Sequence, residues 1–402
     1  MHLNSKKYLS QRSRELTYSG LEEIIALADM KEGVLRLEQG EPDFKTPLHI
    51  TTAATNAVRQ GYVKYTSIEG IRDLREAISH KLAAENKINA DPDSQIIVTA
   101  GSSEGMFLAL QVIIDQGDEA LIPDPGYVSY PRCVRLAGGI PVFYPLRHDG
   151  RFELDLEELH RRITARTKVL VINSPGNPVG NVLTKEELEG IAELSVENDL
   201  IVISDEIYEK IIYDERQHLS IGSLTSMADR TITINSFSKT YAMTGWRLGY
   251  VAATTEIADE IKKLHGTALV CADWVAQCAG LAALTGPQTC IQEMVKQYEE
   301  RRKLMVDGLN RIDGLRCDMP GGAFYAFPRI DQIGMSSREF AHRLLREENV
   351  AIIPGVAFGE QGEGYVRLSF TASLEDIEEG ILRIRHLVEA ASGIGRATHG
   401  SP

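Results

Sequence analysis

The feature of this sequence that most limits its fold is an alternation, between residues 95 and 253, of short apolar runs with longer amphipathic stretches. Such alternation is typical of a mostly parallel β-sheet wrapped by helices. Few of the runs alternate in polarity, as expected for strands that are covered on both faces. The predicted strands are residues 95–99, 119–123, 141–145, 168–173, 200–204, 231–235 and 248–253.

Helix signals separate and follow these runs. Thr184 and Glu187 have the spacing of a capping box, and the apolar residues after them fall on one helical face. Residues 287–312 are predicted to form one long helix that connects the sheet to a C-terminal α+β unit. That unit is expected to contain short strands within 321–328, 350–355 and 365–370, and a closing helix over 374–389.

Charge and composition exclude several classes of function. The net charge of −14 makes nucleic acid and anionic membranes poor partners. No apolar segment is long enough to span a bilayer, and the N-terminus lacks the apolar run of a secretory signal, so a cytoplasmic protein is expected. The scattered cysteines contain no C-x-x-C pair, and therefore predict neither a metal site nor disulfides.

Polar side chains follow consecutive predicted strands, where ligands of open α/β sheets bind. Asn177 lies after 168–173, Asp205 and Tyr208 after 200–204, and Ser236 and Lys239 after 231–235. Singly, each has an ordinary explanation: Asn-Pro forms turns, Asp caps helices, and a Lys after a strand is usually solvated. Their joint placement at one edge of the sheet favours a site.

These residues also carry a resemblance to a known family. The sequence resembles the class I and II aminotransferases, which are fold-type I pyridoxal-phosphate enzymes, and its general run is similar to the microbial aspartate and aromatic aminotransferases. The match covers nearly the whole chain. Its segments are GEPDF (40–44), YTSIEG (65–70), NPVG (177–180), DEIY (205–208), SFSKTYAMTGWRLG (236–249), PGVAFG (354–359) and YVRLSF (365–370).

The resemblance implies a two-part organisation. A large cofactor-binding domain would comprise residues 46–289, with the mostly parallel sheet. A smaller α+β domain would combine residues 1–45 with residues 290–402.

The resemblance implies that pyridoxal 5′-phosphate forms a Schiff base with Lys239, and the chemistry of lysine suits this because its pKa falls readily away from water. Asp205 would face the pyridine nitrogen and keep it protonated, so that the ring can accept electrons. Asn177 and Tyr208 would donate hydrogen bonds to the 3-oxygen of the ring. The predicted catalytic residues are Lys239, Asp205 and Tyr208.

The remaining cofactor contacts are also implied by the resemblance. Ser102 and Ser103 open a predicted helix whose free amides suit a phosphate, and Ser236 and Arg247 would complete the phosphate site. Tyr127 would stack on the cofactor ring. Ser103 stands where some relatives carry lysine.

Tyr65 resembles the tyrosine that reaches the phosphate of a neighbouring subunit. This residue therefore predicts a homodimer with a composite active site.

Arg367 is predicted to bind the substrate α-carboxylate, because the planar fork of arginine matches a carboxylate. Gly40 resembles the glycine whose backbone approaches the same group, and Tyr127 and Asn177 are also predicted to contact substrate. A dicarboxylate such as aspartate would need a second cation. Candidates for that cation are Lys6, Lys7, Arg12 and Arg14, or an arginine from a partner chain, whereas Tyr18 would equally suit an aromatic substrate.

The predicted function is the transfer of an α-amino group to a 2-oxo acid such as 2-oxoglutarate, in ping-pong order, from aspartate or an aromatic amino acid. Lyases and oxidases that act on amino acids are alternatives because the same residues serve them. A ligand-sensing domain of a transcription regulator would carry a basic DNA-binding domain, which this acidic chain lacks. A purely structural α/β protein would have no reason to gather these side chains at one edge.

Overall fold

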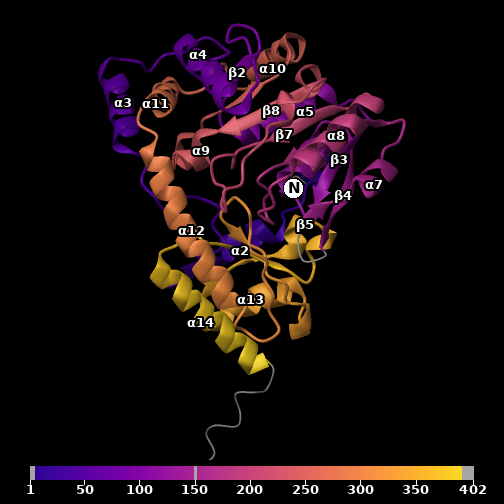
Figure 1. Ribbon diagram of the computed structural model, residues 1–402, viewed down its shortest axis with the longest axis vertical. Coiled ribbons are helices and arrows are strands. Elements are labelled where there is room, and N and C mark those ends of the chain that lie inside the picture. The colour runs from indigo at the N-terminus through magenta and orange to yellow at the C-terminus, as the bar shows by residue number, and fades with distance from the viewer. Residues whose placement is uncertain (1–4, 149–151, 392–402) are drawn as a thin grey trace, which may run out of the picture.

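The computed structural model describes residues 5–148 and 152–391 (Figure 1). Among them, eight strands form a central sheet in the order β2-β9-β8-β7-β6-β3-β4-β5. Neighbours from β8 to β4 run parallel, whereas β2, β9 and β5 join antiparallel. The strands are β2 (Ile96–Thr99), β3 (Glu119–Asp124), β4 (Ile140–His148), β5 (Phe152–Leu154), β6 (Thr167–Asn173), β7 (Ile201–Asp205), β8 (Thr231–Ser236) and β9 (Gly249–Ala252).

Helices cover both faces of this sheet (Figure 1), and the predicted fold class is therefore confirmed. Helices α5, α6 and α10 pack on one face, and α3, α4, α8 and α11 pack on the other. The helices of this region are α3 (Leu48–Arg59), α4 (Arg72–Lys81), the π-helix η2 (Leu82–Asn86), α5 (Ser102–Ile113), α6 (Ser129–Leu136), α7 (Leu156–Arg161), α8 (Lys185–Glu197), α9 (Phe237–Thr240), α10 (Thr255–Ala268) and α11 (Trp274–Thr285), with short 3₁₀ turns η3 (Ile221–Ser223), η4 (Ala228–Arg230) and η5 (Thr244–Trp246).

A smaller α+β region lies below the sheet in Figure 1 and combines both ends of the chain. Strand β1 pairs with β11, and β13 lies between β10 and β12. Its elements are η1 (Ser5–Tyr8), α1 (Gln11–Glu15), α2 (Gly20–Asp29), β1 (Leu35–Arg36), α12 (Thr289–Leu309), β10 (Tyr325–Ala326), η6 (Asp331–Ile333), α13 (Ser337–Glu348), β11 (Val350–Ala351), β12 (Ile353–Pro354), η7 (Gly355–Phe358), η8 (Glu360–Gly362), β13 (Val366–Ser369) and α14 (Leu374–Ala391).

Helix α12 runs from the sheet into this lower region, as predicted for residues 287–312 (Figure 1). The capping box is present, because the Thr184 side chain accepts from the Glu187 amide at 3.2 Å and Glu187 accepts from the Thr184 amide at 2.7 Å. Strands β1 and β5 were not predicted. The domain boundaries at 46–289 stay a prediction.

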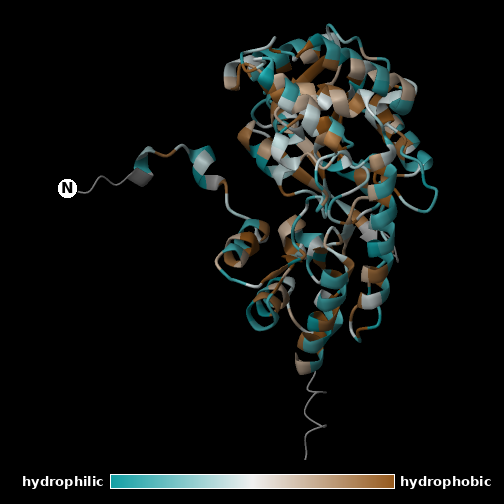
Figure 2. Cartoon of the chain, turned by 90° about the vertical axis from the view of Figure 1, so that its left-hand side faces the viewer, coloured by the Kyte–Doolittle hydropathy of each residue, from teal (hydrophilic) through white to brown (hydrophobic). Residues whose placement is uncertain are grey.

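The buried core consists mostly of apolar side chains, as expected for a packed protein. Figure 2 colours the chain by hydropathy and shows apolar and polar residues interspersed along its helices. Figure 2 also shows that the N-terminal segment with η1 and α1 stands away from the body. In the part of the chain that the structure describes, no helix is both long and apolar enough to cross a membrane.

Strand β9 approaches the start of α5 so closely that only glycine fits at position 249. A β-carbon there would lie 2.7 Å from the Ser102 amide nitrogen and 2.8 Å from the Asn235 carbonyl oxygen. Both contacts are backbone atoms, which cannot move without displacing the strand or the helix.

We expect Gly249→Ala to lower the free energy of unfolding by about 2 kcal/mol, because the added methyl group overpacks this contact. Gly245→Ala is the matched control, since a β-carbon there meets no atom within 4 Å. Thermal unfolding followed by circular dichroism tests this. Equal midpoints for the two variants would contradict the close approach.

Candidate active site

A cavity of about 240 Å³ opens where the parallel strands end. Its walls come from the sheet region and from the lower region together. The lining residues are Leu21, Ile25, Glu38, Gly40, Ser102, Ser103, Met106, Tyr127, Ser129, Tyr130, Asn173, Asn177, Asp205, Ile207, Tyr208, Ser238, Lys239, Arg247, Tyr325 and Arg367.

Strand register brings the polar residues of β6 and β7 together. Asn173 lies opposite Asp205 in the parallel pair. The Asn173 side chain donates to the Asp205 carbonyl oxygen at 3.0 Å and accepts from the Asn177 amide at 2.8 Å. The turn that carries Asn177 is therefore tied to the end of the strand that carries Asp205.

Asp205 is a buried carboxyl group at the base of the cavity. The Tyr130 hydroxyl donates to its Oδ2 at 2.7 Å. Burial raises the pKa of Asp205 to about 6, although the bond from Tyr130 opposes this rise. A buried acid of this kind is suited to hold charge opposite a cationic partner, which would restore its ionised form.

Lys239 follows β8 on the short helix α9, and its amine donates to the Gly40 carbonyl oxygen at 2.6 Å. Burial lowers the pKa of Lys239 to about 8, and the nearby charges of Arg367 and Arg247 act in the same direction while Glu41 opposes them. A substantial fraction of this amine is therefore uncharged at mildly alkaline pH, which is the form that can attack a carbonyl carbon.

Two tyrosine hydroxyls meet beside Gly40. The Tyr208 and Tyr325 oxygens lie 2.7 Å apart, and burial raises the pKa of Tyr208 well above its ordinary value. A β-carbon on Gly40 would lie 2.5 Å from the Tyr325 oxygen. Gly40 thus lets the backbone that accepts from Lys239 approach the Tyr325 phenol closely.

The N-terminus of α5 forms the polar end of the cavity. Ser102 and Ser103 are its first residues, and their amides have no acceptor within the helix. Arg247 lies against this turn, because a β-carbon on Gly101 would meet its Nη2 at 2.5 Å. Helix amides beside a guanidinium form an anion-binding arrangement. Ser236 lies behind this end rather than in the cavity wall, and its hydroxyl donates to the Leu248 carbonyl oxygen at 3.1 Å.

Arg367 is buried on β13, with its guanidinium between the two regions of the chain. Nη1 donates to the Asn177 Oδ1 at 3.1 Å and Nη2 to the Glu38 carbonyl oxygen at 2.7 Å. Its Nε has no hydrogen-bond partner. A buried donor without a partner is costly, so this guanidinium is suited to an anionic ligand.

Of the two remaining predicted residues, Tyr127 lines the cavity and Tyr65 does not. The Tyr127 ring meets Tyr130 edge-on, with centroids 5.6 Å apart. Tyr65 is 78% exposed on the surface of the single chain. Tyr18, Lys7, Arg12 and Arg14 are also absent from the described cavity wall, whose cations are Lys239, Arg247 and Arg367. The side chain of Lys6 lies outside the described residues.

Several residues of the cavity wall were not named from the sequence. Tyr130 lies in the same PGYVSY segment as Tyr127, and Asn173 is the last residue of a predicted strand, so their positions offered a signal. Leu21, Ile25, Glu38 and Tyr325 come from the lower region, and no sequence spacing connects them to the strand ends.

The chain belongs to the aminotransferase class I and II family, whose model matches residues 32–384. It is 44% identical to an aspartate aminotransferase of Pyrococcus abyssi, over 94% of this chain and 98% of the relative. It is 42% identical to aromatic-amino-acid aminotransferase 2 of Thermococcus litoralis, over 95% and 98% of the two chains. The crystal structure of an aromatic aminotransferase from Pyrococcus horikoshii superposes with a TM-score of 0.88 at 44% identity, covering 92% of this chain and 99% of that one. The predicted family and enzyme class are confirmed.

The lowered pKa of Lys239 predicts how the rate of cofactor attachment depends on pH. In protein freed of cofactor, the rate of covalent attachment of pyridoxal 5′-phosphate should increase as pH rises through about 8, because the neutral amine is the nucleophile. Stopped-flow absorbance between acidic and alkaline pH measures this rate. A rate that increases only as pH approaches the ordinary lysine pKa of 10.5 would contradict the lowered pKa.

Proposed function

We propose that this protein transfers the α-amino group of an amino acid to a 2-oxo acid, with pyridoxal 5′-phosphate held by Lys239. The observation that carries the proposal is the placement of Lys239, Asp205 and Arg367 in the wall of one cavity. An amine with a lowered pKa, a buried acid and a guanidinium with a free donor are what this chemistry requires.

The residues present fit the cofactor. The start of α5 and Arg247 suit its phosphate, with Ser102 and Ser103 as further donors and Ser236 behind them. Asp205 suits the ring nitrogen, Asn177 and Tyr208 suit the 3-oxygen, and Tyr127 offers a ring face. When bound, pyridoxal 5′-phosphate supplies an aldehyde and an electron-accepting ring.

The side chains of the chain have distinct proposed roles. Lys239 would hold the cofactor, and its amine, once free, would accept the proton from the substrate α-carbon and donate it to the carbon of the cofactor's aldehyde group. Asp205 keeps a proton on the ring nitrogen opposite its carboxylate. Arg367 binds the α-carboxylate that amino and oxo acids share, with Gly40 leaving room for it.

The choice of donor rests on the relatives and on the cavity wall. Relatives carry the names of aspartate and of aromatic-amino-acid aminotransferases, so both donors are proposed, with 2-oxoglutarate as acceptor. The described wall holds no cation beyond the three that already have proposed roles. A distal carboxylate would therefore need a cation from a second copy of the chain, whereas Leu21 and Ile25 suit an apolar or aromatic side chain.

We also propose that the protein is a homodimer with a composite site. Exposed apolar side chains cluster in and after α3, including Leu48, Val58, Val63 and Tyr65, and such clusters mark interfaces. Tyr65 would then reach the phosphate site of the second copy. Location in the cytoplasm stays a prediction.

Lys239→Ala should remove the visible absorbance of the bound cofactor and nearly all turnover, because no other amine in the described cavity wall can take its place. The test measures the turnover of a panel of amino acids with 2-oxoglutarate by the parent enzyme and the variant, and determines whether the parent kinetics are ping-pong. Release of ammonia or peroxide by the parent enzyme, without formation of a new amino acid from 2-oxoglutarate, would replace aminotransfer with a lyase or an oxidase reaction. Full activity in the variant would remove Lys239 from the reaction.

Arg367→Lys should lower kcat/KM for amino and oxo acids alike by about 30-fold, which corresponds to about 2 kcal/mol, because the charge remains but the planar fork is lost. Arg302→Lys is the matched control, since Arg302 is also buried and pairs with Asp214 away from the cavity. Steady-state kinetics on both substrates measure the effect. A loss restricted to one class of side chain would reassign Arg367 to specificity.

A further inference from the structure

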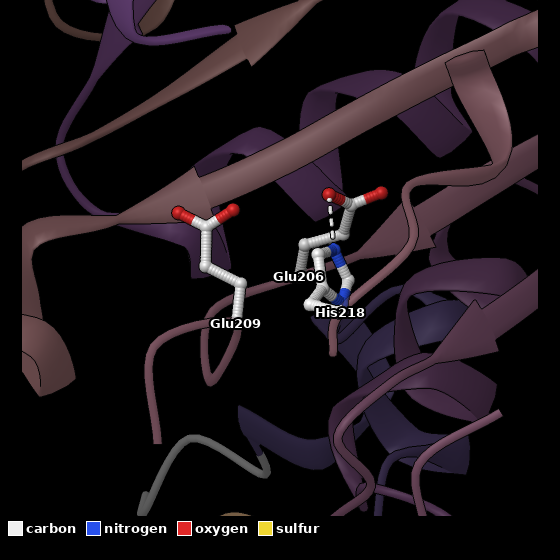
Figure 3. Close-up of side chains that lie close together, drawn as sticks. All are labelled: Glu206, Glu209 and His218. Carbon is white, nitrogen blue, oxygen red and sulfur yellow. Dashed lines mark hydrogen bonds and ion pairs between the residues drawn. The ribbon is translucent and has the colours of Figure 1, made fainter. Parts of the chain in front are cut away.

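A buried network of charged and polar side chains lies behind the segment that carries Asp205 and Tyr208. Glu206 and Glu209 belong to that segment, and Figure 3 shows them beside His218. Neither glutamate lines the cavity. Their partners Lys81 and Asn86 come from the end of α4 and from η2, on a different part of the chain.

The network has two connected halves. His218 Nε2 lies 2.9 Å from the Glu206 Oε2, and the hydroxyls of Ser204 and Ser220 donate to the Glu206 Oε1 at 2.8 and 2.6 Å. Lys81 forms an ion pair with Glu209.

Asn86 joins the two halves, because its Nδ2 donates to Glu209 at 2.7 Å and to Glu206 at 3.1 Å. Its Oδ1 accepts from Lys81 at 2.8 Å.

These charges are held inside the protein at a cost in desolvation, which the partners offset. Burial alone would raise the pKa of Glu209, but the charge of Lys81 lowers it to about 2. The pKa of Lys81 is raised in turn by Glu209 against the effect of its own burial. Both groups are therefore ionised at neutral pH.

Glu206, Glu209 and His218 could alternatively form a site for a divalent cation, because their ligand atoms lie within 4.8 Å of one another. The ammonium of Lys81 already contacts Glu209, and Asn86 and His218 already contact Glu206. Positive charge and donors thus surround the oxygens that an ion would need. The cluster is an internal network rather than a vacant cation site.

The network is well placed to fix the cavity side of the same segment. Glu206 directly follows Asp205, and Glu209 directly follows Tyr208. Asp205 and Tyr208 line the cavity while their neighbours are anchored to α4 and η2. A shift of this anchor would move the carboxyl group and the phenol relative to Lys239.

We infer that Lys81 and His218 are positioning residues which, through Glu209 and Glu206, hold Asp205 and Tyr208 in place for the reaction. This inference rests on the proposed function. It predicts that a defect in the anchor changes catalysis and the geometry of the bound cofactor, and not stability alone.

The experiment compares Lys81→Met and His218→Gln with a matched control, Glu119→Gln, in the holoenzyme. Glu119 is also a buried glutamate of the sheet region, paired with Arg166 and accepting from Thr164 at 2.6 Å, but it lies at the opposite end of β3 from the cavity. The readouts are kcat and KM, the visible circular dichroism of the bound cofactor, its dissociation constant and the thermal midpoint.

We expect Lys81→Met to lower kcat by about tenfold with little change in KM, because small displacements of catalytic groups are amplified in rate. The circular dichroism band of the cofactor should change, and His218→Gln should act in the same direction if Lys81→Met does not fold. Glu119→Gln should lower the thermal midpoint and leave kcat and the band unchanged.

A double variant separates position from charge balance. Lys81→Met with Glu209→Gln removes both charges, so its thermal midpoint should recover relative to Lys81→Met alone, while kcat and the band stay altered. Recovery of kcat together with stability would overturn the inference, as would single variants that behave like Glu119→Gln. Failure of the parent protein to take up cofactor or to form oxo acid would reject the proposed function instead.

Discussion

The in-register parallel pairing of β6 with β7 is the constraint on which the site depends. Because Asn173 lies opposite Asp205, the ends of these strands are joined by a side-chain bond as well as by the sheet. The strand ends fix the positions of the segments that follow them. The turn with Asn177, the segment with Tyr208 and the helix with Lys239 each begin directly after the last residue of a strand. The lower region then completes the cavity by packing against these strand ends.

Desolvation acts on the two central groups in opposite directions. It raises the pKa of Asp205 to about 6 and lowers that of Lys239 to about 8. Removal from water penalises whichever form is charged, so the pKa values of an acid and a base in one cavity both shift toward 7. Groups with such values exchange protons at little cost near neutrality. Tyr130 moderates the effect on Asp205 by its hydrogen bond, and thereby limits how far the acid departs from its ionised form.

The strands and the strand-end residues were predictable from the sequence because buried parallel strands are apolar throughout and their polar successors stand out. Lys239, Asp205 and Asn177 were predicted in this way, and all three line the cavity. Strand β5 gave little signal, since it is a short edge strand that pairs only with β4. Glu38 and Tyr325 reach the cavity only through the packing of the lower region, which no local pattern encodes. Tyr65 is exposed on the single chain, and its predicted role concerns a second copy.

Arg367 holds the side chain of Asn177 from the sheet region with one nitrogen and the backbone of Glu38 from the lower region with another. The same guanidinium stacks on Tyr325 and Phe358, with its central carbon 4.4 and 4.9 Å from their ring centroids. Arg367 thus connects segments that are far apart in the sequence, and a rotation of one region against the other would alter these contacts. The affinity of this arginine for an anion would consequently depend on the relative position of the two regions.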